Sequence, residues 1–548
     1  MADKTDIAII GGGLAGLVAA YEAVKRGRKV VVLDQEGPQS LGGQAFWSLG
    51  GLLMINTPEQ RRMGIRDSRD LAAQDWMGSA QFDRPEDENP RKVAEAYLDF
   101  AAGPMRQYLH DVGMRWFPVV GWAERGGAHA SGHGNSVPRF HVTWGTGTGV
   151  VAPFARLAKE AEAAGKLRLA FRHRVTGLDV SNGRIKGVRG DVLADDTAVR
   201  GASTNREVIG DFALEAESVI VASGGIGGDH EKVRKVWPVD RLGPAPKVMV
   251  AGVPDYVDGQ MQDVAKAAGA GAINEDRMWH YCEGLKNWDP IWPNHGIRIL
   301  PGPSSIWFDA NGDRMEAPCL PGFDTLSTLK RILSTGHEHS WFILTQKIIE
   351  KEFALSGSEQ NPDLTSGKWS AVIKERLGKG ATGAVEAFKE HGDDFVVARD
   401  FDTLVAGMNA ITPDTPLDGA KLRAQIAARD AQLTNPFAKD AQIIAIRQAR
   451  AYRGDRLIRT AKPHAILDPA NGPLIAVRLN ILTRKTLGGL HTDLEARALR
   501  PNGSVFDGLY AVGEVAGFGG GGYHGYNALE GTFLGGCIFS GRAAGRVA

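Results

Sequence analysis

The feature that most constrains this sequence is a glycine-rich turn close to its start. Residues 6–10 form a short apolar run, and the letters GGGLAG follow at 11–16. Residues 14–26 then have helical spacing, a second apolar run covers 29–33, and Asp34 ends it. This order of strand, glycine turn, helix, strand and acid predicts a parallel βαβ unit that binds a dinucleotide.

Each conserved position of the GxGxxG pattern has its own physical reason. Gly11 permits the tight turn, Gly13 lets the backbone approach a pyrophosphate, and Gly16 allows the helix to pack closely on the strand. The start of the helix offers unpaired N–H groups and a partial positive charge to that pyrophosphate. Asp34 is placed to bind ribose hydroxyls, and an acid there disfavours a 2′-phosphate. We therefore expect NAD or FAD rather than NADP.

Two further segments favour FAD over NAD. The loop LGGQAFWSLGG (41–51) follows the acid, and its glycines would let main-chain amides approach a second part of a long cofactor. Near the other end of the chain, Glu514 follows an apolar run and could present a carboxylate to ribityl hydroxyls. NAD has no ribityl chain that would need such a group.

Composition excludes several classes of function. Lysine plus arginine and aspartate plus glutamate both number 64, so the chain has no net positive charge to attract nucleic acid or an acidic membrane. The three cysteines lie far apart, which argues against haem, iron–sulfur and zinc motifs and favours a reducing compartment. No apolar run reaches the roughly 18 residues of a membrane span. We expect a cytoplasmic protein with no nucleic-acid partner, no transmembrane segment and no metal site.

The pattern along the chain predicts an α/β fold in two parts. A helix is expected at 151–164, strands at 167–180, 183–190 and 212–221, and a tryptophan- and proline-rich region with helices from 282 to about 456. The end returns to a strand, a glycine-rich loop and a final helix from about Leu529. We therefore predict a doubly wound Rossmann-type FAD-binding domain, residues 1–281 and 486–548, with an inserted α+β capping domain, 282–485.

Several longer motifs carry a family resemblance. GGGLAGLVAA with VVVLD, the loop GGQAFWSLGG, SVIVASGGIGG and the late stretch GLYAVGEVAG occur in this order along the chain. Together they resemble, nearly end to end, the flavoproteins that include fumarate reductase, succinate dehydrogenase, L-aspartate oxidase and the 3-ketosteroid dehydrogenases. The resemblance implies FAD as the cofactor.

The resemblance also implies which residues contact FAD. Members with covalently bound flavin carry a histidine in the second loop, and residues 44–48 contain none, so the FAD should be non-covalent. Besides the turn and Asp34, the expected cofactor-binding residues are Ala15, Gly42, Gly43, Gln44, Gly51, Val175, Gly224, Gly225, Asp258, Glu514, Asn527, Leu529 and Thr532.

The departures from the family pattern bear on the substrate. The dicarboxylate enzymes have an arginine in a stretch similar to VHGANRLGGN, whereas this chain reads YHGYNALEGT, with Ala528 at that place. The histidine before their TxGG motif is replaced by Arg484 or Lys485. Because alanine cannot reproduce the bidentate fork of a guanidinium, we do not expect fumarate or succinate to be the substrate.

With the dicarboxylate enzymes disfavoured, the sequence most resembles the ketosteroid-dehydrogenase branch of the family, whose members use tyrosines near the substrate carbonyl. Tyr523 and Tyr526 occupy a comparable place, and His524 between them is a further catalytic candidate. A tyrosine can be the base only if neighbouring positive charge or oriented hydrogen-bond donors lower its pKa, and Lys485 and Arg484 could supply that charge. Aromatic packing of the loop against the cofactor is an equally good explanation of both tyrosines. For Tyr281, a packing role is as plausible as one in the site.

The predicted activity is hydride transfer between flavin N5 and a carbon near a carbonyl, on an apolar ketone or steroid-like small molecule, with an external electron acceptor or donor. One alternative is a reductase of a small unsaturated carboxylate with a relocated arginine clamp, for which Arg298, Arg314 and Arg484 are available. The other is a flavin-binding redox module without turnover.

Overall fold

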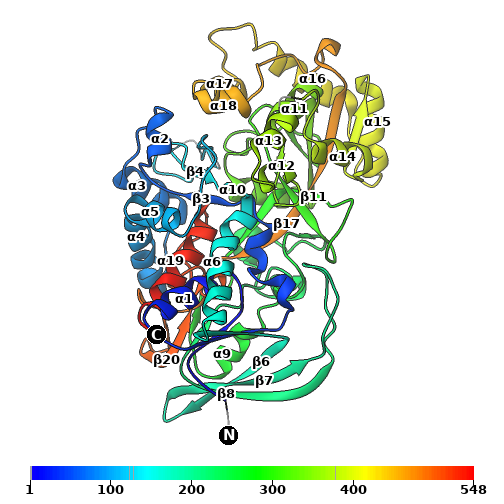
Figure 1. The fold of residues 1–548 in the computed structure, drawn as a ribbon. Helices are drawn as coiled ribbons and strands as arrows, with labels where there is room; N and C mark the ends of the chain where they lie inside the picture. Colours follow the sequence, from blue (N-terminus) through cyan, green and yellow to red (C-terminus); the bar gives the residue numbers. More distant parts are fainter. Residues whose placement is uncertain (1–2, 123, 128, 377) are drawn as a thin grey trace.

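The described residues build two large mixed β-sheets that are covered by helices, and two short two-stranded sheets besides (Figure 1). The computed structural model describes residues 3–548 except 123, 128 and 377. The cofactor-binding motifs lie in the part that contains both chain ends, and residues 278–486 form most of the other part. No helix in the described part of the chain is both long enough and apolar enough to cross a bilayer.

The first sheet has a parallel core formed by apolar strands buried between helices and other strands. Its strand order across that core is β20-β8-β1-β2-β5, and the strands pair in parallel, with Ile7 opposite Val30 and Ile10 opposite Val221. The nearly continuous apolar runs are what burial on both faces requires. The strands are β1 (Asp3–Ile10), β2 (Val30–Asp34), β5 (Leu167–Phe171), β8 (Val208–Val221) and β20 (Val505–Ala511).

Glycines allow the two end helices of the chain to pack closely. Helix α1 (Leu14–Lys25) contacts α19 (Thr532–Gly545) and α6 (Thr146–Ala163). A Cβ atom on Gly541 would lie 2.4 Å from the carbonyl oxygen of Ala15, and one on Gly545 would lie 2.4 Å from that of Ala19. The N-terminal and C-terminal segments are thereby held together beside the first glycine turn.

The opposite side of this sheet carries a hairpin and a short helix. Strands β6 (His173–Ser181) and β7 (Arg184–Leu193) pair antiparallel, and β7 continues onto the first half of β8. Helix α9 (Gln260–Ala267) packs on β6, and Met261 and Ala265 enter the same core as Val175.

The second sheet has the order β13-β14-β17-β11-β12-β15 and a core of its own. Its central strand β17 (Leu474–Thr486) pairs with β14 (His339–Thr345) and β11 (Met278–Lys286). Trp341, Phe342 and Ile343 of β14 are fully buried. The outer strands are β12 (Gly296–Leu300), β13 (Ile306–Asp309) and β15 (Ala354–Leu355), with β9 (Val250–Ala251) and β16 (Phe395–Ala398) beside β17.

Strands β11 and β17 are neighbours at the two ends of the segment 278–486, and the earlier residues 226–251 also join the second part, with Met249 in its core and β9 in its sheet. Met278 lies opposite Thr486 and Trp279 opposite Lys485. Residues 278–281, which precede the expected start of the capping domain at 282, therefore pair within the second sheet.

Candidate active site

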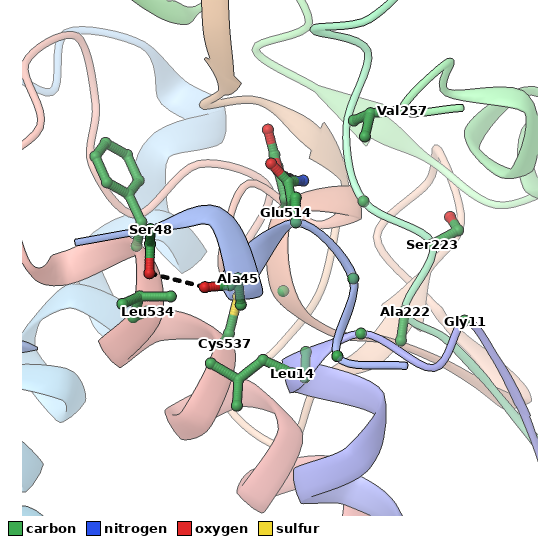
Figure 2. A pocket seen from close by; sticks show the side chains of 18 of the residues that line it. Gly11, Leu14, Ala45, Ser48, Ala222, Ser223, Val257, Glu514, Leu534 and Cys537 are labelled. Atoms are coloured by element: carbon green, nitrogen blue, oxygen red, sulfur yellow. Dashed lines mark hydrogen bonds between the residues drawn. The ribbon is translucent and has the colours of Figure 1, made fainter. Parts of the chain in front are cut away.

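A cavity runs from the carboxyl ends of the parallel strands to the second sheet. Its wall combines the turn after β1, the loop 42–51, residues 222–224 after β8 and residues 512–514 after β20, and Figure 2 shows side chains from these segments around one space. Loops at the carboxyl ends of parallel strands are the usual ligand site in open α/β sheets. Residues of the second sheet, among them Tyr281, Arg298 and Arg484, line its far end.

The glycines of the first turn differ in what requires them. Gly11 has a φ of +106°, and a Cβ there would lie 2.5 Å from the carbonyl oxygen of Ala222; a Cβ on Gly16 would lie 2.2 Å from that of Gly11. The fold therefore requires both. Gly13, in contrast, has a φ of −71°, and a Cβ there would approach no protein atom closer than 3.9 Å. Because no protein neighbour requires glycine at 13, the space beside it fits the pyrophosphate of a dinucleotide at the start of α1.

Asp34 is fixed at the edge of the same cavity. Its Oδ2 accepts a hydrogen bond from the Gly12 amide at 2.7 Å, and its Oδ1 accepts one from the Glu36 amide at 2.9 Å. Burial raises the pKa of Asp34 to about 6, although these two donors oppose the rise. An oriented carboxylate that lines the cavity fits the ribose hydroxyls of the cofactor.

Three predicted residues from distant segments meet in the middle of the cavity. Lys485 Nζ donates to Gln44 Oε1 at 3.1 Å, and Gln44 Nε2 donates to the carboxylate of Glu514. The Thr486 amide donates to Glu514 Oε1 at 2.8 Å. Burial lowers the pKa of Lys485 while Glu514 opposes that change. Figure 2 shows Glu514 near the centre of the space, where it can accept from polyol hydroxyls.

The expected cofactor-binding residues divide into two groups. Twelve line the cavity: Gly11, Gly13, Ala15, Asp34, Gly42, Gly43, Gln44, Gly51, Val175, Gly224, Asp258 and Glu514. Gly16, Gly225, Asn527, Leu529 and Thr532 are not part of its lining.

The residues of the second group lie behind the cavity lining, and two of them position groups near it. A Cβ on Gly225 would lie 2.6 Å from Glu514 Oε1, so this glycine makes room for the glutamate. Thr532 Oγ1 donates to the carbonyl oxygen of Leu529 and closes the turn before α19. The Oδ1 atom of Asn527 is buried without a hydrogen-bond partner.

The structure places the predicted catalytic loop residues away from the cavity. Tyr523 is fully buried, and its hydroxyl donates to the Thr532 carbonyl at 2.6 Å. His524 Nε2 lies 2.8 Å from Thr532 Oγ1. The hydroxyl of Tyr526 donates to Asp83 Oδ1 at 2.7 Å. None of the three lines the cavity, whereas Arg484 and Lys485 do.

The pKa values of the two tyrosines also differ from the expectation. Burial raises the pKa of Tyr523 well above its ordinary value. Burial and the hydrogen bond to Asp83 raise the pKa of Tyr526, although the guanidinium groups of Arg241 and Arg277 lie 3.6 and 4.1 Å from its ring centre. The positive charge near Tyr526 thus comes from these arginines, and it lowers the pKa by less than burial raises it.

A different tyrosine does line the far end of the cavity. Tyr281 donates to Glu530 Oε1 at 2.6 Å, and Arg298 Nη1 donates to the same oxygen at 2.6 Å. The Arg298 guanidinium also stacks 3.8 Å from the centre of the Tyr281 ring. Arg298 Nε also lies 3.7 Å from Glu283 Oε2, and burial raises the pKa values of both Glu124 and Glu283 nearby.

Sequence reasoning missed Glu530 and gave Tyr281 no preference over a packing residue. A signal for Glu530 was present: it is the one acidic residue among the last 34, in a glycine-rich tail. Tyr281 had no such signal, because only the pairing of β11 with β17 brings it to the cavity.

Comparison with known proteins agrees with this geometry. The sequence model of a family described as "FAD binding domain" matches residues 6–534. The chain belongs to this family. It is 59% identical over 534 residues to a KsdD-like steroid dehydrogenase of Mycolicibacterium smegmatis, which covers 97% of this chain and 96% of the relative. It is 58% identical over 541 residues to one of Mycobacterium tuberculosis, covering 99% and 95%.

Solved structures confirm the fold class. The 3-ketosteroid Δ1-dehydrogenase of Sterolibacterium denitrificans superposes with a TM-score of 0.66 at 16% identity, covering 99% of both chains. The 3-ketosteroid-Δ4-(5α)-dehydrogenase of Rhodococcus jostii RHA1 gives 0.63 at 18%, covering 99% of this chain and 96% of that one. The predicted α/β fold, the family resemblance and FAD as the cofactor are confirmed, and the flavoprotein is an FAD-dependent oxidoreductase.

Proposed function

We propose that this flavoprotein is a CH–CH dehydrogenase or reductase of an apolar, steroid-like ketone, with FAD bound non-covalently. The names of its close relatives support the substrate class, and the loop 44–48 offers no histidine for a covalent bond. When bound, FAD supplies the N5 atom that accepts or gives the hydride. The observation that carries the proposal is the Tyr281–Glu530–Arg298 group in the cavity that contains the dinucleotide turn.

Tyr281 and Glu530 can handle the proton that leaves the adjacent carbon. The phenol donates to Glu530 Oε1, so it can pass its own proton to the carboxylate while its oxygen accepts one from the substrate. This relay does not require the lowered pKa that an isolated tyrosine base needs, and burial raises the pKa of Tyr281. Arg298 holds the carboxylate in place.

Replacement of one hydroxyl tests this assignment. Tyr281→Phe should retain FAD but slow flavin reduction by a 3-ketosteroid about 100-fold or more, the usual contribution of a positioned acid–base group. The readout is anaerobic bleaching of the flavin band. Tyr526→Phe is the matched control and should react normally, because its hydroxyl lies outside the cavity. Equal rates for Tyr281→Phe and wild type would remove Tyr281 from the reaction.

One observation favours a second candidate, a substrate that carries a carboxylate. Of the three arginines available for a clamp, Arg298 is paired with Glu530, and Arg314 is paired with Asp440 at 2.6 Å. Arg484 forms no ion pair among the described residues, and its Nε is buried without a partner. It lines the cavity, and its contact to Ser356 Oγ is long, 3.4 Å. An unpaired guanidinium in a cavity is suited to a carboxylate.

The anaerobic assay also separates a third possibility, a redox module without turnover, for which no ketone or acid would reduce the flavin. We further propose that electrons pass to an external acceptor and that the protein acts in the cytoplasm. The three cysteines, Cys282, Cys319 and Cys537, are free thiols, in keeping with a reducing compartment.

A further inference from the structure

A cationic surface covers the outer end of the second domain. Residues 433–462 contain seven lysines and arginines and only two aspartates, although the chain as a whole has no net charge. This segment includes α17 (Ala441–Ala449) and α18 (Arg453–Ile458). Figure 1 shows both helices at the far end of the molecule from the chain termini. We call residues 433–462 the α17–α18 surface.

The positive charge of this surface is not neutralised. Both aspartates are engaged by arginines from elsewhere, Asp440 by Arg314 at 2.6 Å and Asp455 by Arg125. Burial together with the nearby charge of Arg450 lowers the pKa of Lys351, which adjoins α18. Four exposed cations have no carboxylate within 4 Å in the described part of the chain: Lys439, Arg453, Arg456 and Lys462.

Large apolar side chains lie exposed among these cations. Phe437 is 89% exposed, and Leu457, Ile444 and Ile458 are between 43% and 53% exposed. Arg447 donates to the carbonyl oxygens of Leu433 and Asn435 and so holds the loop that presents Phe437. Single exposed apolar residues are common on proteins, but here four occur within 22 residues, in the same segment as the four cations named above.

We propose that the α17–α18 surface docks on an anionic lipid bilayer. Lysine and arginine are attracted to acidic headgroups, and phenylalanine, leucine and isoleucine insert at the boundary with the acyl chains. A second copy of the chain suits this surface less well, because a two-fold contact would bring the same cations together. Nucleic acid is also less favoured, because its phosphates could pair with the cations but would offer Phe437 and Leu457 no apolar environment.

The docking surface adjoins the cavity wall. Arg459 Nη2 donates to the carbonyl oxygen of Leu300 at 2.7 Å, and Leu300 lines the cavity. On the other side, Asp455 pairs with Arg125, whose neighbour Glu124 accepts from the Glu530 amide at 3.0 Å. The α17–α18 surface is therefore connected, through Arg459 and Asp455, to the end of the cavity that Tyr281 and Arg298 line.

Vesicle co-sedimentation of the purified holoenzyme tests the proposal. Wild type should bind vesicles that contain phosphatidylglycerol, bind pure phosphatidylcholine weakly, and lose binding as salt rises. Arg453→Gln/Arg456→Gln should lower the partition coefficient about 30-fold, about 5-fold for each charge. Leu457→Ser/Ile458→Ser should lower it about 10-fold or more.

Two matched double variants are the controls. Val208→Ser/Ile209→Ser removes residues that are 50% and 64% exposed at the start of β8, at the opposite end of the molecule. Lys159→Gln/Lys186→Gln removes two exposed charges far from α18. Both should bind vesicles as wild type does. Failure of wild type to bind acidic vesicles would overturn the proposal, as would equal losses in control and α18 variants. A concentration-dependent dimer that α18 variants abolish, without vesicle binding, would assign the surface to a second copy instead.

Discussion

Replacement of Gly13 with alanine separates what the cofactor requires from what the fold requires. On the protein side the added methyl group has room, since its nearest neighbour would be the Ala222 carbonyl oxygen at 3.9 Å. The φ of −71° is one that alanine adopts readily. Alanine is a poorer N-cap than glycine and destabilises the fold by about 0.5–1 kcal/mol. It also restricts the unfolded chain, which stabilises the fold by about 0.4–1 kcal/mol. The apoprotein should therefore keep its stability within about 0.5 kcal/mol.

On the ligand side the same methyl group occupies the space where a pyrophosphate would approach the start of α1. Loss of one hydrogen bond to a charged group costs about 1.5–3 kcal/mol, which weakens FAD binding about 10- to 150-fold. At a free FAD concentration of 100 times the wild-type Kd, the cofactor stabilises wild type by about 2.7 kcal/mol. A variant that binds 100-fold more weakly gains only about 0.4 kcal/mol at that concentration.

Thermal unfolding of the apoprotein with and without FAD measures both quantities, the stability of the fold and the affinity for FAD. Gly13→Ala should unfold near the wild-type temperature without FAD and shift little when FAD is added. Gly11→Ala and Gly16→Ala are the controls: their methyl groups would lie 2.5 and 2.2 Å from carbonyl oxygens, so both should lower the stability of the apoprotein itself. An unchanged FAD affinity in Gly13→Ala, or a loss of apoprotein stability as large as that of Gly11→Ala, would refute the reasoning.

Two further predictions concern charged residues of the cavity. Because the pKa of Asp34 is about 6, its carboxylate is present above that pH and is lost as pH falls through it, so FAD affinity should fall up to 10-fold per pH unit below pH 6. Fluorescence titration of FAD against pH checks this, and Asp34→Asn should bind weakly with no such pH dependence. Arg484→Gln should weaken binding of a keto acid about 10-fold relative to its methyl ester, measured by perturbation of the flavin spectrum, whereas an equal effect on acid and ester would contradict a carboxylate role.

Most residues that the sequence assigned to the cofactor line one cavity, because local patterns determine where they lie. Gly11, Gly13 and Asp34 lie within one βαβ unit, whose geometry is the same wherever strand, turn and helix follow in this order. Gln44 and Glu514 are far apart in sequence but lie in motifs of known position, and the structure joins them through Lys485.

The substrate half could not be predicted in the same way. Tyr281, Arg298 and Glu530 come from β11, β12 and the tail; the register of the second sheet places Tyr281 and Arg298, and the packing of the tail against this sheet adds Glu530. The choice of Tyr523 and Tyr526 followed from their place in a glycine-rich loop, but such a loop can turn its side chains inward or outward. Packing decides this: Tyr523 lies against Trp76 and Tyr97 in the core. The local excess of cations at residues 433–462 was likewise not apparent from the net charge of the whole chain, which is zero.

The pairing of β11 with β17 has a consequence for the modularity of the chain. The segment 278–486 begins and ends in two adjacent hydrogen-bonded strands, with Met278 of β11 opposite Thr486 of β17. Everything between them is one block whose two ends are neighbours in space. An insertion or deletion inside this segment can therefore change the second part without breaking a strand of the parallel sheet, whereas exchange of the whole part would also have to replace the contacts that residues 226–251 make with its core and with β17.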